Sequence, residues 1–170
     1  MKANIFKNIV DTFQRQQQSQ VPAFGRWKKT VHRADGTVEE VGFGNVVTAL
    51  GLDEIAALAI GNAGSTAFYI AVGTVSDQFS LGSTILQMGE VLRQTPPTKT
   101  SSKEVLYMVT TIGGASDGLT GVALTSAAMG NHVDSGQGIA FNLSNSVNTT
   151  LQASDILTLE AQIQIGSHNL

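Results

Sequence analysis

The chain has 170 residues, 42% of them hydrophobic, and a formal charge of −3 at neutral pH. This length allows one domain with a buried core, and the absence of cysteine excludes disulfide frameworks and cysteine-ligated zinc sites. The first residues lack the continuous apolar stretch of a secretory signal, and no run of roughly 18 uncharged apolar residues occurs, so we expect a soluble protein without a leader or a membrane span.

The charges are unevenly distributed along the chain. Residues 1–45 carry seven basic and four acidic side chains, a net charge of +3, while the rest carries three basic and nine acidic side chains, a net charge of −6. The beginning of the chain therefore differs in kind from its body.

Residues 1–25 are predicted to form an amino-terminal arm and connector. The apolar spacing in residues 3–18 predicts a short amphipathic helix, whose apolar side needs a partner. The glutamine-rich connector that follows contains Pro22 and can bury little surface, so we expect it to be extended. The side chains expected to bind a partner are Ile5, Phe6, Ile9, Val10 and Phe13.

Residues 26–170 are predicted to form a β-rich domain that opens with a hairpin at 26–43. Two apolar runs flank Asp35-Gly36, a strong short-range hairpin signal. Five apolar side chains of these two runs are expected to be in the strands. They are Trp27, Val31, Val38, Val41 and Phe43.

One helix, at about 48–60, is expected in the body. Thr48 can cap its amino end, and Gly61 lies where a left-handed cap would end it. Side chains at helical spacing should face a sheet. They are Val47, Leu50, Ile55 and Leu58.

After this helix the pattern becomes β. Short runs rich in β-branched and aromatic residues are separated by clusters of Gly, Asn, Asp and Ser, and Pro96-Pro97 indicates a loop or a sheet edge. Five or more such strands predict an antiparallel β-sandwich or a barrel-like domain. The runs are 67–74, 104–114, 120–128, 138–147 and 154–166.

The last run alternates apolar and polar residues with the period of two that is typical of a strand covering a core. Threonine, glutamate and glutamine occupy its polar side. Its core-facing residues are Leu157, Leu159, Ala161, Ile163 and Ile165.

Signals for a metal or phosphate site are weak. His32, His132 and His168 do not lie at helical ligand spacing. His132 and Asp134 could offer two ligands, but a solvated turn explains them better. The glycine-rich segment 113–118 lacks the lysine and the helix of a phosphate cradle, so we expect a hairpin loop there. We expect no metal and no cofactor.

Catalytic signals are also weak. Asp53-Glu54 lies in the opening turn of the predicted helix, where the helix dipole favours negative charge, and Glu39-Glu40 lies on a hairpin strand. Neither pair identifies a general acid or base, and no G-x-S-x-G elbow occurs. We expect no catalytic residue and no enzyme.

A basic cluster near the hairpin raises the question of nucleic acid. Arg26, Lys28 and Lys29 surround Trp27, and Arg33 adds a fourth positive charge. Four charges make a thin patch on an acidic protein, so an acidic protein partner is favoured over nucleic acid.

The segments NVVTALGLDEIAALAIG, FYIAVGT, GEVLR and SDILTLEAQIQIG occur in an order that resembles a group of bacteriophage virion proteins. The resemblance covers about residues 26–166 and is made of short motifs. This chain has GTVSD where GTGTT is usual, and residues 1–25 have no counterpart. The matching positions are Asn45, Val47, Thr48, Gly51, Leu52, Ala71, Gly73, Thr74, Glu90, Arg93, Ser154 and Asp155.

The resemblance implies a structural part of a phage particle. Expected roles are a head decoration, cement or head-fibre protein, with a tail or baseplate adaptor or fibre as the alternative. A homo-oligomer, with a trimer favoured, would bind the major capsid protein or another virion protein. The protein is expected in the virion, which is assembled in the cytoplasm of the bacterial host. Neither nucleic acid nor membrane is an expected partner.

A glycan-binding module is a further alternative on the same β-domain. The aromatic side chains with polar groups that could stack on a sugar are Trp27, Tyr69 and Tyr107, and Asp117 and Asp134 are the acidic residues to vary in a test.

Overall fold

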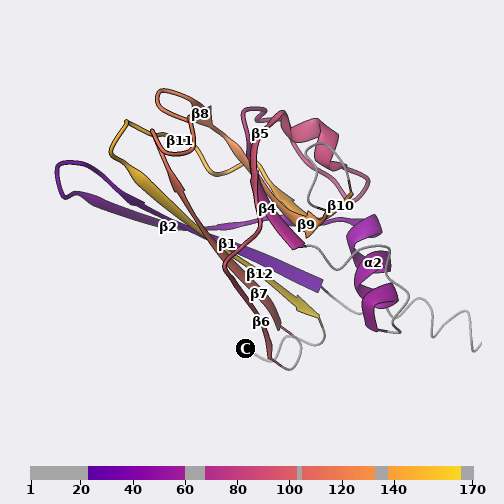
Figure 1. The fold of residues 1–170 in the computed structure, drawn as a ribbon. Helices are drawn as coiled ribbons and strands as arrows, with labels where there is room; N and C mark the ends of the chain where they lie inside the picture. The colour runs from indigo at the N-terminus through magenta and orange to yellow at the C-terminus, as the bar shows by residue number, and fades with distance from the viewer. Residues whose placement is uncertain (1–22, 60–67, 103–104, 133–137, 166–170) are drawn as a thin grey trace, which may run out of the picture.

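The computed structural model describes residues 23–59, 68–102, 105–132 and 138–165, and the fold of this part is mainly β (Figure 1). Two antiparallel five-stranded sheets face each other as a sandwich, and one α-helix packs against β10 (Ile139–Ser144). The predicted fold class is therefore confirmed. The predicted arm, with Ile5, Phe6, Ile9, Val10 and Phe13, lies outside the described residues.

Sheet A has the strand order β2-β1-β12-β7-β6. Its central strand, β12, pairs with β1 on one side and with β7 on the other, in each case antiparallel. The strands are β1 (Ala23–His32), β2 (Val38–Gly44), β6 (Thr98–Ser102), β7 (Val105–Gly113) and β12 (Ile156–Ile165).

Sheet B has the strand order β3-β10-β9-β4-β5. A third, two-stranded sheet pairs β8 with β11. The remaining elements are β3 (Val46–Val47), α2 (Ala49–Ala59), β4 (Phe68–Gly73), the 3-10 helix η1 (Ile85–Met88), β5 (Glu90–Gln94), β8 (Ala123–Leu124), β9 (Ser126–Asn131), β10 (Ile139–Ser144) and β11 (Thr149–Thr150).

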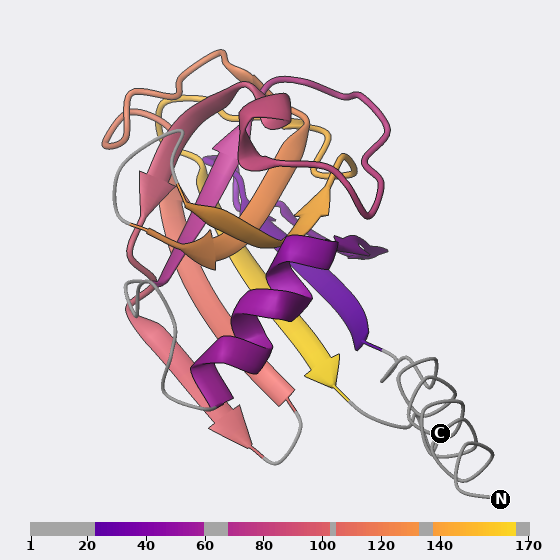
Figure 2. The same cartoon turned by 90° about the vertical axis from the view of Figure 1, so that its right-hand side faces the viewer.

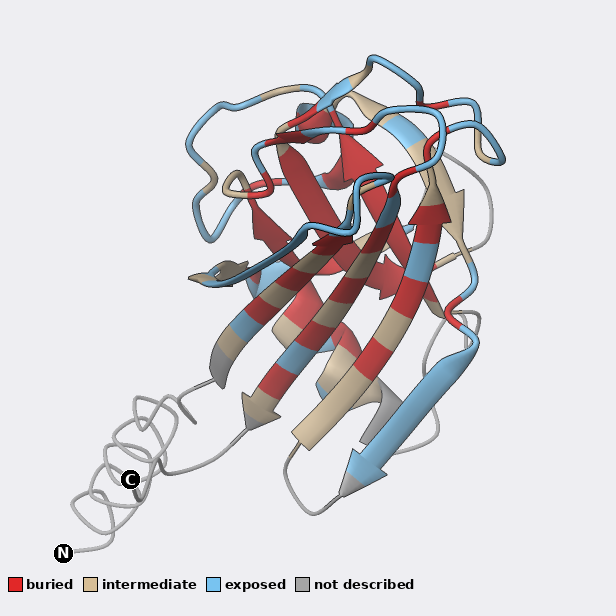
Figure 3. Cartoon of the chain, turned by 90° about the vertical axis from the view of Figure 1, so that its left-hand side faces the viewer, coloured by how far each residue is buried: buried red, intermediate tan, exposed pale blue. Residues whose placement is uncertain are grey.

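The main core lies between the two sheets. Along β1, β7 and β12, buried residues alternate with more exposed ones, as Figure 3 shows in its alternating bands. Burial of one side of each strand is what period-two patterning requires. The largest fully buried side chains here include Trp27, Ile70, Met108, Ile112, Leu124, Met129, Phe141, Leu151 and Leu157.

A second, smaller core covers the opposite side of sheet B. The 3-10 helix η1, which contacts β9 and β10, supplies Ile85 and Met88 to this cluster, whereas helix α2 packs on β10 with Ile55 against the main core (Figure 2). Tyr69, Met88 and Leu143 are fully buried in this cluster. Sheet B therefore has buried side chains on both sides, whereas the other side of sheet A carries mostly polar, partly exposed side chains in the described strands.

The predicted terminal strand is confirmed. Leu157, Leu159, Ala161 and Ile163 have no exposed surface. The hairpin is also confirmed, because β1 and β2 pair antiparallel and Gly36 takes a left-handed backbone conformation with φ of 86° in their turn.

The helix begins directly after Thr48, the residue that was predicted to cap it. Thr48 Oγ1 accepts a hydrogen bond from the Gly51 N–H at 2.9 Å, which satisfies a donor of the first turn. The predicted apolar stripe is wrong at two positions: Val47 belongs to β3, and Leu50 is 52% exposed. The side chain of Leu58 and residue Gly61 lie outside the described parts.

Ile55 follows the predicted stripe and packs against the main core. Close packing explains why Gly51 and Glu54 are buried beside it. A Cβ added to Gly51 would lie 2.5 Å from the Cα of Phe141, so the helix approaches β10 more closely than a larger residue would allow. Glu54 is also buried on this side and accepts a hydrogen bond from Asn131 Nδ2 at 2.6 Å.

The chain changes sheets at two edges. Pro96-Pro97 separates β5, an edge of sheet B, from β6, an edge of sheet A, which fits the predicted loop or sheet edge. On the opposite side, Asn45 separates β2 from β3. The strands β3, β5, β6 and β11 were not predicted as separate elements, and the single predicted run 120–128 contains β8 and the start of β9.

Candidate functional site

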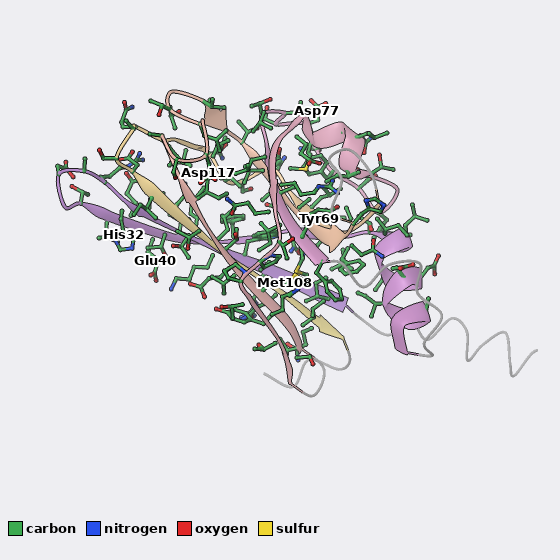
Figure 4. All side chains as sticks on the ribbon, viewed as in Figure 1. His32, Glu40, Tyr69, Asp77, Met108 and Asp117 are labelled. Atoms are coloured by element: carbon green, nitrogen blue, oxygen red, sulfur yellow. The ribbon has the colours of Figure 1, made fainter. Side chains whose placement is uncertain are left out.

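The side of sheet A that faces away from sheet B is a mostly polar surface that five strands build together, and we call it the outer face. Cross-strand pairing places its side chains in rows, for example Glu40, Thr30, Thr158 and Thr111. Figure 4 shows His32 and Glu40 on this side of the hairpin, while Met108 points into the sandwich. The strand order therefore brings distant segments of the chain together on one surface.

An ion-paired group occupies the middle of the outer face. Lys28 Nζ lies 2.9 Å from Glu40 Oε2 and 3.5 Å from Glu160 Oε1. Tyr107 donates its phenolic hydrogen to Glu160 Oε2 at 2.8 Å. One lysine thus bridges the carboxylates of β2 and β12, and a tyrosine from β7 extends the group.

These contacts shift two pKa values in the group. The hydrogen bond to Glu40 raises the pKa of Lys28. Burial raises the pKa of Tyr107, and its hydrogen bond to Glu160 acts in the same direction. Both groups therefore keep their protons at neutral pH, which suits a binding surface better than a general base.

A shallow hollow lies beside this group because Gly42 has no side chain. Its volume is about 360 Å³. Gly42 pairs directly with Lys28, so the open space adjoins the positive charge. The lining residues are Arg26, Trp27, Lys28, Glu40, Gly42, Glu160 and Gln162.

The predicted basic patch is divided by the strand. Arg26 and Lys28 lie on the outer face, whereas Lys29 lies with Trp27 and Val31 on the buried side. The prediction of a single patch of four charges around Trp27 is therefore wrong, because successive residues of a strand point to opposite sides.

Lys29 has a structural role inside the sandwich. Its ammonium group donates hydrogen bonds to the carbonyl oxygens of Val147 and Asn148. Burial lowers the pKa of Lys29. The alternation with Trp27 and Val31 is a signal in the sequence that places it inward.

Arg33 also leaves the patch. It lies at the tip of the hairpin and donates to Glu39, Asp155 and the carbonyl oxygen of Thr150. It therefore ties the hairpin to the turn before β12.

The weak metal and phosphate candidates acquire structural explanations. Asp117 accepts a hydrogen bond from the Gly113 N–H at 2.7 Å and one from Gln94 Nε2 at 2.9 Å. Residues 114–118 form a turn, but the predicted hairpin loop at 113–118 is wrong, because β7 pairs with β6 and β12 while β8 pairs with β11. The carbonyl of His132 accepts from Arg93 Nη1 at 3.0 Å. Asp134 lies outside the described residues. Within the described ranges, no group of three or more His, Cys, Asp or Glu could hold a metal ion.

The two adjacent carboxylate pairs are separated by their elements. On α2, Asp53 is exposed and Glu54 is buried; both follow the first turn, so their predicted position in the opening turn is wrong. On β2, Glu39 bonds Arg33, while Glu40 bonds Lys28 on the other side of the strand.

A buried ion pair lies on β5. Arg93 and Glu90 form two hydrogen bonds, of 2.9 and 2.7 Å, with side chains only 4% and 5% exposed. The guanidinium carbon lies 3.8 Å from the ring centre of Tyr69. Burial raises the pKa of Tyr69 well above its ordinary value.

Two of the three aromatic side chains that could stack on a sugar are buried. Trp27 is 2% exposed and stacks on Phe43 at 6.4 Å, and Tyr69 has no exposed surface. Of the three, Tyr107 alone reaches the outer face, where it is partly buried.

The residues that carry the phage resemblance hold the fold together. The amide oxygen of Asn45 accepts a hydrogen bond from Trp27 Nε1 at 3.0 Å, and its amide nitrogen donates one to the Gly25 carbonyl oxygen at 3.0 Å. A Cβ added to Gly73 would lie 2.1 Å from the carbonyl oxygen of Met88. Five other matching positions also make structural contacts: Thr48 and Gly51 at the start of α2, Glu90 and Arg93 in the ion pair on β5, and Asp155 with Arg33.

No family model, curated protein or solved structure matches this chain. In the described part, no helix is long and apolar enough to cross a membrane.

Proposed function

We propose that this chain is a structural component of a bacteriophage particle, most specifically a capsid decoration, cement or head-fibre protein. It forms a homo-oligomer through its β-domain and docks by its amino-terminal arm on the major capsid protein or another virion protein. It acts as an architectural part of the virion and not as an enzyme.

The observation that carries this proposal is the use of charged side chains as braces. Arg33 pairs with Asp155, Arg93 pairs with Glu90, and Lys29 bonds carbonyl oxygens of a distant loop. These contacts brace strands, turns and a loop against one another, as a rigid building block requires.

Exposed leucines give the domain further surface for assembly. Leu50, Leu81 and Leu86 are 52%, 62% and 73% exposed. Leu50 and Leu81 adjoin each other, because the Ala49 N–H donates to the Leu81 carbonyl at 2.9 Å. Exposed apolar side chains on neighbouring segments favour contact with another protein.

The arm supplies the proposed docking element. Ile5, Phe6, Ile9, Val10 and Phe13 follow one side of the predicted helix. Burying a side chain of this kind contributes about 1.5–3 kcal/mol before the costs of association. Five such side chains could hold an arm in an apolar groove of the shell.

Deletion of residues 1–20 tests the docking role. The shortened chain should keep its fold and its oligomer mass but should be absent from purified particles, as judged by quantitative mass spectrometry. A sharper pair of variants is Ile9→Asp, which should lose particle binding, and Asn8→Asp, which should retain it. Full occupancy of the particle by the deleted chain would remove the docking proposal.

The copy number per particle separates the head location from the alternative at the tail or baseplate. A decorated shell needs many more copies than a tail attachment. The trimer is proposed on the resemblance, and cryo-EM of intact particles would give both the symmetry and the location.

A further inference from the structure

Strand β2 forms one edge of sheet A, with β1 as its partner among the described strands. Every residue of β2 except Phe43 is exposed, including Val38 at 54% and Val41 at 46%. The β1–β2 hairpin extends away from sheet B, so its outer edge is open (Figure 1). An open strand edge offers unpaired backbone groups to another chain.

The backbone groups on this edge can be assigned from the hairpin turn. The Arg33 N–H donates to the Thr37 carbonyl at 2.8 Å. In an antiparallel ladder, hydrogen-bonded pairs alternate with unbonded pairs. Lys29 and Val41 are then a bonded pair, so the N–H and C=O of Glu40 and Gly42 point away from β1.

We infer that β2 pairs antiparallel with β2 of a second copy of this chain, about a two-fold axis at Val41. Sheet A then continues from one copy into the other. Glu40 lies opposite Gly42 of the second copy, and the two valines at position 41 face each other on the inner side. Because the contact is two-fold, each interaction occurs twice.

Charge complementarity favours this register. Gly42 leaves the hollow beside Lys28 and Arg26 open. In the paired sheet, the carboxylate of Glu40 reaches the hollow of the second copy and meets its positive charges. Opposite charges across neighbouring strands stabilise a sheet, whereas like charges directly opposite destabilise it.

Neighbouring registers fit less well. A shift by two positions in one direction places Glu40 opposite Glu40, which sets two carboxylates against each other. A shift by two in the other direction places Gly42 opposite Gly42 and shortens the pairing to Glu40–Gly44. The register centred on Val41 uses all of Val38–Gly44. Shifts by one position would mismatch both the exposed faces and the outward backbone groups.

This contact specifies how two copies of the chain meet in the proposed homo-oligomer. It rests on the proposed function only in assuming that the chain self-associates. It requires no particle, so it is measured on the purified chain alone. Failure of arm docking and failure of strand pairing are therefore separate results.

Gly42→Glu is the decisive variant. The new carboxylate would face Glu40 of the second copy, but within its own chain it would lie beside Lys28, so the fold should be unharmed. A Cβ at this position meets nothing closer than the Trp27 carbonyl oxygen at 3.9 Å. Gly42→Ala adds the Cβ without the charge and should keep the pairing.

Sedimentation velocity of the full chain over a wide concentration range measures the outcome. The wild-type chain should have twice its 17.8 kDa mass, or an even multiple if the trimer also forms. Gly42→Glu should weaken the two-fold contact by about 100-fold or more. Thr100→Glu, which adds the same charge at the opposite edge of sheet A, should leave the mass unchanged.

Three results would overturn the inference. They are a wild-type monomer throughout the concentration range, an odd-numbered assembly, and a Gly42→Glu chain with the wild-type mass. Circular dichroism of each variant shows that the fold is retained.

Discussion

Arg33 Nη1 lies 2.8 Å from Asp155 Oδ2, which joins the tip of the β1–β2 hairpin to the turn before β12. The same carboxylate accepts backbone hydrogen bonds from Gln152 at 2.8 Å and from Ala34 at 3.2 Å. The backbone bond from Gln152 and the side-chain bond from Arg33 lower the pKa of Asp155. The protonation of Asp155 is therefore linked to the stability of the fold.

We predict that this linkage makes the fold sensitive to acid. Because the pKa of Asp155 is lower in the folded chain than in the unfolded one, the ionised carboxylate stabilises the fold above about pH 4. That contribution is lost as the pH falls through the folded-state pKa. Asp155→Asn should lower the urea midpoint at pH 7 and flatten its fall below pH 4. The exposed Asp53→Asn should do neither, and equal pH profiles for the wild type and Asp155→Asn would contradict the linkage.

Lys29→Met should destabilise the domain, although it removes a buried charge. The substitution leaves the carbonyl oxygens of Val147 and Asn148 without their donor, which costs roughly 1–3 kcal/mol. Chemical denaturation at neutral pH measures the loss in the free energy of unfolding. Lys99→Met, on the exposed strand β6, is the matched control and should change the midpoint little (Figure 3). An unchanged midpoint for Lys29→Met would show that the carbonyls find other donors.

Gly51→Ala should lower stability, against ordinary helix propensity. In an open helix, alanine is favoured over glycine by about 1 kcal/mol. Here the new methyl group would meet the backbone of Phe141 at 2.5 Å, so α2 must move away from β10, at a cost of about 1–3 kcal/mol. Thermal denaturation followed by circular dichroism measures the change. Ala56→Gly, at an exposed position of the same helix, calibrates propensity alone, and a rise in Tm for Gly51→Ala would refute the close approach.

Arg93→Met should be among the most damaging single changes. It removes the guanidinium from the buried carboxylate of Glu90, and breaking a buried pair in this way costs about 3–5 kcal/mol. The double variant Glu90→Gln with Arg93→Met should recover most of the loss, because the buried charge is then gone as well. A double-mutant cycle of unfolding free energies measures the coupling. Additive effects of the two single variants would mean that the pair does not act as a unit.

Several elements could be predicted because their signals are local. The alternation in β12 fixes which side of the strand is buried, and Asp35-Gly36 fixes a tight turn in the hairpin. Thr48 was predicted as a helix cap because the hydroxyl bonds a backbone group only three residues away. Each of these features depends on the backbone geometry of neighbouring residues, which the sequence carries directly.

The candidate site depended on strand order, which no local pattern contains. Lys28, Glu40 and Glu160 meet because β1 lies between β2 and β12, and residues 28 and 160 are far apart in the chain. The hollow at Gly42 likewise exists only beside its neighbouring strand. On the buried face of α2, Ile55 was predicted correctly and Leu50 was not, because Gly51 is the residue that lies against Phe141, a tertiary requirement that the apolar spacing does not contain.

By itself, the sequence determined the β-rich class, the hairpin, the capped helix and the buried face of the last strand, because these follow from backbone periodicity and short-range hydrogen bonds. Tertiary structure alone decided which strands became neighbours, and so which charges pair and which edge stays open. The physical reason is that pairing between strands distant in the chain depends on how well whole faces pack, a property of the assembled sheets and not of any one segment.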